Sequence, residues 1–388
     1  MNIVEVKSPK DKQDFLNIAK ELYKDDPNWS CPLDVEINKI FNPHLNAYFN
    51  HGEAIRWILK DSKGKQIGRI AAFINNDKAF TETQPTGGCG FFECINNEKA
   101  AFLLFDTAKA WLKDRGMEAM DGPINFGEND NHWGLLVDGF IPQGMGMPYN
   151  HKYYKDLFYK YGFKVFFEQY SYHMDLRKPL DGRFRKIAQW IARKPEYRFE
   201  HFTFKNKDKY INDLISIYTE AWQFHNNFTP LERTTVEEIM EDAKLILEEE
   251  FVWFAYHNEK PIAFFVMMPD FNQVLRRING KLDLLSKLKI FYYLKKKTIT
   301  RARITVMGVV PEFQGKGVES AIFLKLEEVM ERKPHYNELE LSWVGDFNPK
   351  MQSIYEAVGG KKMKTHQTLR YLFNREAKFV RYPIIKHD

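Results

Sequence analysis

The sequence contains little that would suggest a secreted, membrane-spanning or metal-binding protein. Its three cysteines, Cys31, Cys89 and Cys94, cannot all pair, and no Cys/His cluster has the spacing of metal ligands. No apolar run approaches the roughly 20 residues that span a bilayer, and the first residues lack the apolar region of a signal peptide. We therefore expect no metal, no transmembrane segment and a reduced, cytoplasmic location.

Strong net charge is also absent. A formal charge of +5 over 388 residues is too small to indicate nucleic-acid binding by itself. The hydrophobic fraction of 44% is sufficient for real cores, and the length suits two domains of ordinary size.

The most informative segment is an apolar strand followed by a glycine-bearing loop and a helix. The strand at 305–309 ends before Pro311, which cannot donate a ladder hydrogen bond. Gly315 and Gly317 then allow a tight turn and close approach of a ligand, and a helix begins at Val318. Unpaired N–H groups at that helix start could bind a pyrophosphate. A Rossmann site fits less well, because no third glycine stands at the required position.

A second element follows at a suitable distance. Residues 338–343 alternate as a strand, with Glu338, Glu340 and Ser342 opposite leucines. The next helix has Asn348 as its expected N-cap and Gly359 at its C-terminal cap.

The run Gln314-Gly315-Lys316-Gly317 and the helical element from Asn348 to Gly360 resemble the signature of the GCN5-related N-acetyltransferases, or GNAT superfamily. The resemblance implies that acetyl-CoA, or another short acyl-CoA, is the co-substrate and that Tyr355 is a general acid beside the CoA sulfur. It implies these cofactor-binding residues: Val309, Gln314, Gly315, Lys316, Gly317, Val318 and Asn348. For the general base that an amine acceptor needs, the sequence offers Glu340 or His366.

The whole chain has the pattern of two copies of one fold. Together with the resemblance, this pattern predicts the fold class α/β, a mixed α+β sheet built as two tandem acyl-CoA N-acyltransferase folds. We expect a first domain at 1–180, a linker at 181–196 and an acyl-CoA-binding domain at 197–388. Each copy is expected to close with two strands, at 166–170 and 172–176 in the first and around 361–373 in the second.

The first copy is predicted to be degenerate as a cofactor site. Residues 91–98 contain no glycine loop, and Glu93 and Glu98 would repel a pyrophosphate. Counting back from Gly162 places Phe158 at the position of Tyr355, although a shift by one residue would place Tyr159 there. A long polar loop at 122–134 could recognise substrate or could be an ordered surface loop fixed by Asx turns.

An insertion at 271–300 carries the strongest local charge. Its arginines and lysines face a single acid, Asp283, and alternate with leucines and aromatic residues. Such a segment could bind an anionic partner, an RNA backbone or a membrane surface, shield CoA, or be a solvated helical arm.

The sequence therefore predicts an acyltransferase that moves an acetyl or other short acyl group from acyl-CoA to an amine of a small molecule or peptide. Two alternatives stay open. The protein could bind acyl-CoA without turnover, as a sensor or scaffold. It could also be a FemX-like aminoacyl transferase using charged tRNA.

Overall fold

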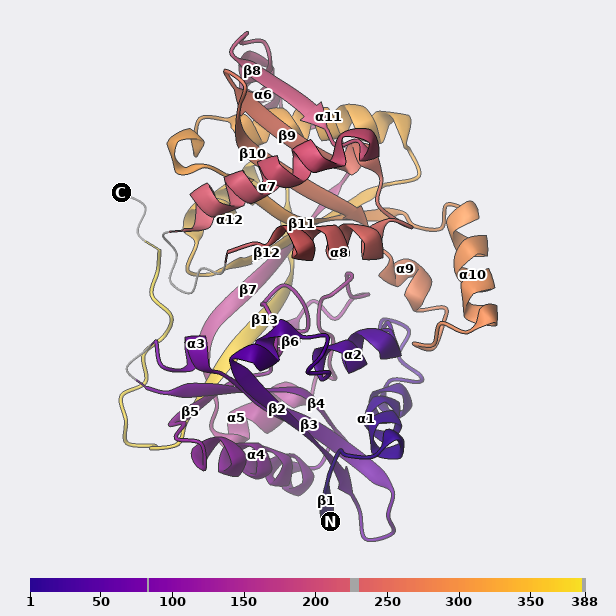
Figure 1. Cartoon of the computed structure of the whole chain (residues 1–388), viewed down its shortest axis with the longest axis vertical. Helices are drawn as coiled ribbons and strands as arrows, with labels where there is room; N and C mark the ends of the chain where they lie inside the picture. Colours follow the sequence, from indigo (N-terminus) through magenta and orange to yellow (C-terminus); the bar gives the residue numbers. More distant parts are fainter. Residues whose placement is uncertain (82–83, 224–229, 386–388) are drawn as a thin grey trace.

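A computed structural model describes residues 1–81, 84–223 and 230–385 of the chain. Its strands form a single mixed sheet in the order β1-β2-β3-β4-β5-β13-β7-β12-β11-β10-β9-β8, with β6 paired to β13 (Figure 1). The strands are β1 (Asn2–Glu5), β2 (Gly52–Lys60), β3 (Gln66–Asn75), β4 (Thr86–Cys94), β5 (Ala119–Gly122), β6 (Leu135–Asp138), β7 (Lys164–Asp175), β8 (Tyr197–His201), β9 (Val252–His257), β10 (Lys260–Pro269), β11 (Arg301–Val309), β12 (Glu338–Gly345) and β13 (Lys361–Leu372).

The helices repeat in the same order in each half. The first half contains α1 (Pro9–Leu22), α2 (Asp34–Ile40), α3 (Asn76–Ala79), α4 (Glu98–Lys113) and α5 (Tyr154–Tyr161). The second contains α7 (Lys207–Trp222), α8 (Arg233–Ala243), α9 (Asn272–Leu275), α10 (Leu284–Lys295), α11 (Val318–Arg332) and α12 (Pro349–Ala357). Leaving out the short α3 and the extra strand β6 of the first half and the inserted α9 and α10 of the second, both halves run strand, two helices, three strands, helix, strand, helix and closing strand. The predicted duplication is therefore present.

Strand alternation explains how helices cover both faces of the sheet. In β2, Trp57 and Leu59 belong to the core cluster beneath α4 and α5, whereas Ile58 packs with Phe15 of α1 on the opposite face. A larger core cluster fills the second half. Among the described residues, no helix combines the length and apolar character needed to cross a bilayer.

The closing strands are exchanged between the two halves. β13, from the end of the chain, pairs with β5 of the first half, and β7, from the first half, pairs with β12 of the second. β7 and β13 also pair with each other. The expected pair of closing strands is one long strand in each half, because β-bulges, rather than turns, absorb the irregularities near Lys362 and Thr368. The expected linker at 181–196 contains α6 (Gly182–Ala192), which Asp181 caps.

Candidate functional site

Two parallel strands diverge at the centre of the second half. β11 and β12 pair only through Arg301–Arg303 and Glu338–Glu340. Beyond this point β11 continues to Val309, paired with β10 on its other side. Among the residues that the structure describes, no strand pairs with the second edge of β11 from Ile304 onward. Such an edge can form strand-like hydrogen bonds with an extended ligand.

The predicted cofactor loop lies at the end of this open edge. The Nε2 of Gln314 donates to the carbonyl of Val309 at 3.1 Å, which fixes the turn between strand and helix. Gly315 and Gly317 have φ values of 73° and 85°, so both need the left-handed conformation that glycine adopts without strain. Gly317 is the N-cap of α11 and has no side chain to satisfy the helix N–H groups. Gln314, Gly315 and Lys316 are exposed and Val318 is buried.

The two glycines of the loop have different surroundings. A Cβ on Gly315 would meet no atom within 4 Å, whereas one on Gly317 would lie 3.1 Å from Ile187 and 3.2 Å from Ile191 of α6. α6 therefore covers the loop on the side of Gly317 and leaves the side of Gly315 open.

The helix α12 places the other two predicted residues. The Oδ1 of Asn348 accepts from the N–H of Met351 at 3.2 Å and caps this helix. Tyr355 is buried, and its ring lies edge-on to Tyr172. Burial raises the pKa of Tyr355, although the charge of nearby Arg303 acts in the opposite direction. The hydroxyl therefore keeps its proton at neutral pH.

The first copy offers a direct comparison. Phe158 precedes Gly162 by four residues, as Tyr355 precedes Gly359, and both glycines are left-handed, with φ of 109° and 92°. Phe158 is fully buried. This geometry favours the alignment of Phe158, rather than Tyr159, with Tyr355.

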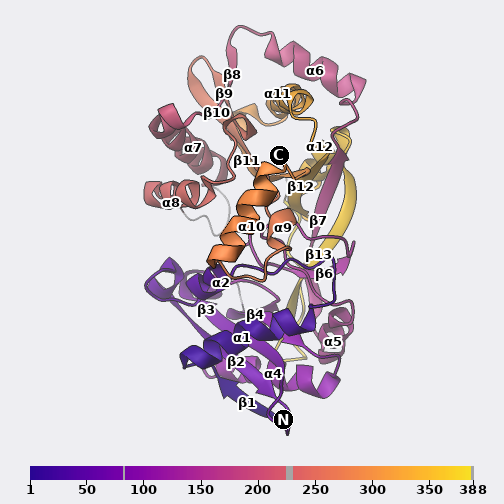
Figure 2. The ribbon, with the colours of Figure 1, turned by 90° about the vertical axis from the view of Figure 1, so that its right-hand side faces the viewer.

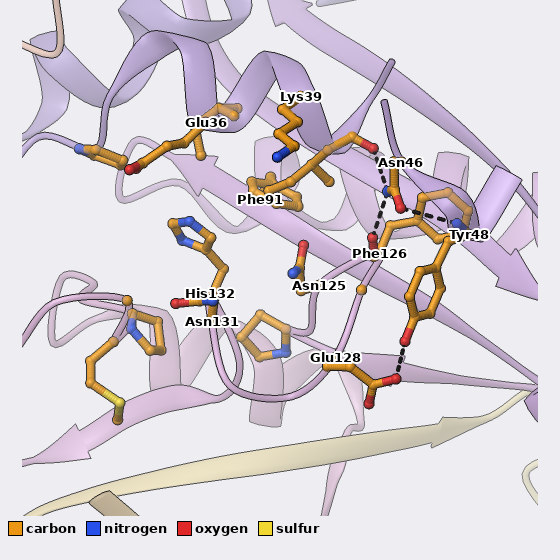
Figure 3. Close-up of a pocket in the computed structure, with 18 of the residues that line it drawn as sticks. Glu36, Lys39, Asn46, Tyr48, Phe91, Asn125, Phe126, Glu128, Asn131 and His132 are labelled. Atoms are coloured by element: carbon orange, nitrogen blue, oxygen red, sulfur yellow. Dashed lines mark hydrogen bonds between the residues drawn. The ribbon is translucent and has the colours of Figure 1, made fainter. Parts of the chain in front are cut away.

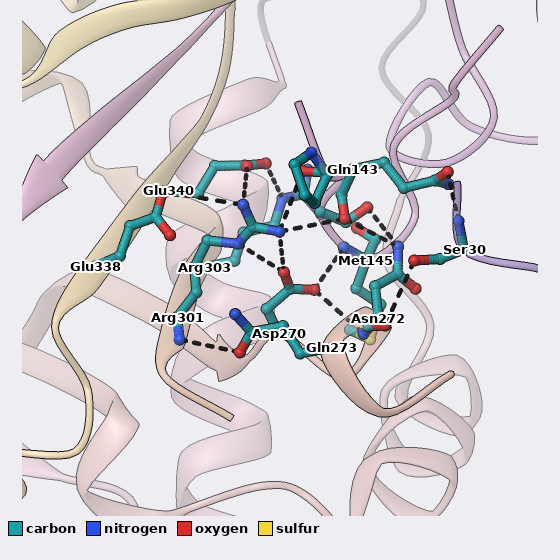
Figure 4. A network of polar contacts seen from close by, with 12 residues as sticks. Ser30, Gln143, Met145, Asp270, Asn272, Gln273, Arg301, Arg303, Glu338 and Glu340 are labelled. Atoms are coloured by element: carbon teal, nitrogen blue, oxygen red, sulfur yellow. Dashed lines mark hydrogen bonds and ion pairs between the residues drawn. The ribbon is translucent and has the colours of Figure 1, made fainter. Parts of the chain in front are cut away.

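Glu340 lies at the point where the strands diverge and is fully buried (Figure 4). Its carboxylate is 2.9 Å from Nε2 of His173, 2.6 Å from Nζ of Lys364 and 3.3 Å from Nε of Arg303. Burial alone would raise the pKa of Glu340, but Lys364, His173 and Arg301 together hold it well below the usual range. A carboxylate held so firmly in its charged form is a weak proton acceptor, which disfavours the predicted role of Glu340 as general base.

His366 is also fully buried. Its Nε2 lies 3.1 Å from the carbonyl of Pro148, and burial lowers its pKa to about 4. The imidazole is therefore neutral at pH 7 and weakly basic, so this alternative base is disfavoured as well.

The network around Glu340 joins the two halves. Arg303 donates to the carbonyl of Met145, and Asp270 accepts from the N–H of Met145 at 2.9 Å. Arg301 pairs with Asp270 at 2.5 Å and donates to the carbonyl of Gln143 at 3.2 Å. The segment 142–147 of the first half is thus held against β11 of the second. The sequence interpretation missed these arginines, although their alternation in Arg301-Ala302-Arg303, matching Glu338-Leu339-Glu340, was a usable signal.

A cavity of about 1040 Å³ lies between the two halves. From the first half it is lined by α2, the segment 143–150 and the polar loop; from the second, by Tyr218, Leu231, Thr235, Phe271 and Leu275. Figure 3 shows the first-half wall, where Phe91, Asn125 and His132 surround the space. Met145 and Met147 line the cavity and also contact Arg303, so its wall adjoins the point where β11 and β12 diverge.

The polar loop at 122–134 is ordered and lines the cavity, and its role in substrate recognition stays a prediction. It is ordered, because Ile124 donates to the carbonyl of Cys89 at 2.9 Å and Phe126 is buried. It also lines the cavity through Asn125, Asn131 and His132. The Oδ1 of Asn125 is buried without a hydrogen-bond partner, and burial lowers the pKa of His132 to about 4. Among the described residues, no group of three histidines, cysteines or acids is placed to hold a metal.

Comparisons with known proteins agree with this architecture. Residues 211–359 match the model of the Acetyltransferase (GNAT) family. The chain is 28% identical to the "Bacterial ceramide synthase" of Caulobacter vibrioides over 379 residues, covering 95% of this chain and 96% of the relative. It is 26% identical to "Protein YghO" of Escherichia coli over 369 residues, covering 92% of each.

Solved structures show the same fold over the whole length. A tandem GNAT protein from the clavulanic acid biosynthesis pathway has a TM-score of 0.57 at 11% identity, covering 97% of this chain and 99% of that one. A GCN5-related N-acetyltransferase from Sphaerobacter thermophilus has a TM-score of 0.50 at 10% identity, covering 97% and 98%. The second half thus contains a GNAT-family domain, and the chain has the two-domain architecture of tandem GNAT proteins, with both copies of the fold sharing one sheet.

Proposed function

We propose that this protein is an N-acyltransferase that joins an acyl group from acyl-CoA to the amine of a long-chain amino alcohol, forming a ceramide-type amide. The observation that carries the proposal is the nearly full-length similarity to a bacterial ceramide synthase. A ceramide is a fatty-acid amide of such an amino alcohol, and forming that amide bond is an acyl transfer to nitrogen. The acyl group would then be longer than the short chain expected from the sequence.

We propose that the acyl-CoA binds where β11 and β12 diverge. Its pantetheine arm would pair with the open edge of β11, and its pyrophosphate would bind the N–H groups at the start of α11. The first copy supports this choice by contrast. There the side chain of Asn97 accepts from the N–H of Ala100 at 2.9 Å and caps α4. β4 and β5 pair only through residues 86–88 and 119–121. The chain around Ile124 occupies the space where these strands separate, because a Cβ on Gly90 would lie 1.8 Å from the carbonyl oxygen of Ile124.

We propose that the acceptor binds in the cavity between the two halves. Its volume of about 1040 Å³ is at the upper end of ordinary ligand pockets, which suits a long chain. Apolar side chains such as Ile37, Phe126 and Leu275 line it together with Asn125 and His132, a combination that fits a molecule with a hydrocarbon tail and a polar end.

The chemistry needs a neutral amine and a protonated leaving group. Moving an ammonium group from water into the cavity lowers its pKa, so the amine loses a proton on entry without a strong protein base. The amine nitrogen attacks the thioester carbonyl carbon, the C–S bond breaks, the nitrogen releases its extra proton to water, and the thiolate takes a proton. The protonated hydroxyl of Tyr355 is proposed to hydrogen-bond this sulfur and to deliver that proton.

The proposal is tested by incubating the purified protein in detergent micelles with palmitoyl-CoA and sphinganine. Release of the CoA thiol and formation of the amide, detected by mass spectrometry, are the expected results. Acetyl-CoA and a lysine peptide serve as the competing donor and acceptor. Turnover of the short pair alone would contradict the assigned substrates, and acyl-CoA binding without any turnover would favour the sensor alternative.

A matched pair of variants tests the acceptor site. Thr235 of α8 lines the cavity and its neighbour Thr234 does not, and both are exposed. Thr235→Trp should raise the KM for the long-chain amine at least several-fold without changing acyl-CoA affinity. Thr234→Trp should leave both unchanged. Equal effects of the two substitutions would show that the cavity is not the acceptor site.

A further inference from the structure

The helix α10 exposes a continuous apolar stripe to solvent. Leu284, Leu285, Leu288, Phe291 and Tyr292 share one side of the helix and are between 50% and 76% exposed. Their spacing of three, four, seven and eight residues is that of a helical face. Leu282, 41% exposed, precedes the helix. Large apolar side chains gathered on one exposed face of a helix indicate a binding surface rather than a purely solvated arm.

The opposite side of α10 fixes it to the rest of the molecule. Ser286 and Ile290 are buried, and the guanidinium of Arg277 lies over the ring of Tyr293 at 4.5 Å. The preceding segment is held by Lys20, which donates to the carbonyl of Asn279 at 3.1 Å, and by the N–H of Asp34, which donates to the carbonyl of Gly280 at 2.8 Å. The helix α10, whose ribbon is labelled in Figure 2, is therefore held in a fixed orientation, and its apolar stripe with it.

Positive charge accompanies the stripe. Six lysines in and beside α10 are exposed: Lys281, Lys287, Lys289, Lys295, Lys296 and Lys297. Asp283 is the only acidic residue between 271 and 300, and it caps the helix by accepting from the N–H of Ser286 at 2.8 Å. Leucines and aromatic residues flanked by lysines on a helix of fixed orientation match the interface of an anionic bilayer, where apolar side chains enter the acyl boundary and lysines meet lipid phosphates.

We propose that α10 docks the protein onto the surface of an anionic lipid bilayer. An RNA partner fits the lysines but not the stripe of exposed leucines, because RNA offers no apolar phase to receive them. The placement also suits a lipid substrate, a link that rests on the proposed function. Phe271, just before the start of α9, and Leu275, the last residue of α9, line the cavity, so a bilayer bound by α10 would lie near the acceptor site.

The test is flotation of the full-length protein with vesicles containing 40% phosphatidylglycerol in phosphatidylcholine, and with vesicles of phosphatidylcholine alone. We expect binding to the anionic vesicles that weakens with salt and is at least tenfold weaker to the neutral ones. The variant Leu285→Ser/Leu288→Ser/Phe291→Ser should lose at least tenfold in vesicle affinity. Phe80→Ser, at a phenylalanine 57% exposed beyond α3, is the matched control and should bind as the parent does.

Three outcomes would overturn the proposal: no flotation of the parent protein, equal flotation of parent and triple variant, or binding to single-stranded RNA in place of vesicles. Because the three substituted side chains are exposed, circular dichroism should show an unchanged fold. Acyl transfer measured in detergent micelles needs no bilayer, so failure of vesicle binding and failure of the proposed activity are separate results.

Discussion

Lys364 and Glu340 form a salt bridge of 2.6 Å in the interior, although β7 separates the strands that carry them. The residues are 2% and 0% exposed. Lys364 belongs to the last strand of the chain, and Glu340 to the strand that borders the proposed acyl-CoA site. The exchange of closing strands is what brings these two charges together, so the pair links the fold of the whole sheet to the geometry of the site.

Removing one charge of this pair should be costly. Lys364→Met leaves the buried carboxylate with fewer partners and should lower the free energy of unfolding by about 3–5 kcal/mol. The matched control is Lys325→Met, because Lys325 pairs with Glu328 on the exposed face of α11 at 3.0 Å. That substitution should cost less than about 1 kcal/mol. Urea unfolding of both variants measures the difference, and similar midpoints would show that Lys364 does not stabilise the interior.

The sequence predicted the order of elements well, because glycine caps and hydrophobic periodicity are local signals. It did not predict the strand exchange. The segments at 164–175 and 361–372 are suitable strands in either half, and their partners depend on pairings more than 150 residues apart in the chain. The two short closing strands expected in each half are one continuous strand, with bulges in the pairing of β7 and β13.

A pH-dependent stability should arise from His173. Burial alone would lower the pKa of His173, but its hydrogen bonds to Glu338 and Glu340 raise it above the usual 6.5. Between the unfolded and the folded pKa the native state holds more protons, so stability falls as pH rises through this window. The loss has a limiting slope of about 1.4 kcal/mol per pH unit. Thermal unfolding between pH 6.5 and 8 measures it.

His173→Gln supplies the control for this pH dependence. Glutamine keeps a polar side chain but does not titrate, so the fall in stability above pH 6.5 should be absent. Below about pH 6.5 both proteins should lose stability in parallel, because His132 and His366 have pKa values of about 4 and resist protonation in the folded state. His132 and His366 contribute the same rise in stability to both proteins just above pH 6.5, so the test is the difference between parent and variant. The stability of the parent relative to His173→Gln should decrease from pH 6.5 to 8, and a difference that stays constant or grows would contradict the assigned environment of His173.

The candidate site was only partly visible in the sequence. Gln314, Gly315 and Gly317 are local features, and the structure places them at the start of α11 as expected. Of the charges that surround Glu340, those of Lys364 and His173 could not be anticipated, because both residues come from exchanged strands. From the sequence, Glu340 was therefore predicted as a general base, whereas its partners in the structure keep its carboxylate charged. The cavity depends on both halves and leaves no continuous motif.

Charge at Gly315 should control acyl-CoA affinity. Aspartate and asparagine tolerate its left-handed φ of 73° better than other side chains do, and a Cβ there meets nothing within 4 Å. Gly315→Asp places a negative charge beside the proposed pyrophosphate and should weaken CoA binding at least tenfold, about 1.4 kcal/mol. Gly315→Asn introduces a side chain of the same shape without a charge, so its affinity for coenzyme A should be closer to that of the parent. Calorimetry with coenzyme A compares them, and equal affinities would place the pyrophosphate elsewhere. Gly317 is less suitable, because a side chain there would displace α6.

Tyr355→Phe separates a chemical role from a packing role. Phenylalanine keeps the ring that lies edge-on to Tyr172, so the fold and the affinity for acyl-CoA should be unchanged. If the hydroxyl donates to the leaving thiolate, kcat should fall by about 100-fold. The control is Tyr172→Phe, which removes a hydroxyl from the neighbouring ring and should leave kcat within a few-fold of the parent. Because burial raises the pKa of Tyr355, the hydroxyl stays protonated, and the kcat of the parent should exceed that of Tyr355→Phe up to at least pH 9. If both variants turn over at the parental rate, Tyr355 serves packing alone, and the proton must reach the thiolate from water in the cavity.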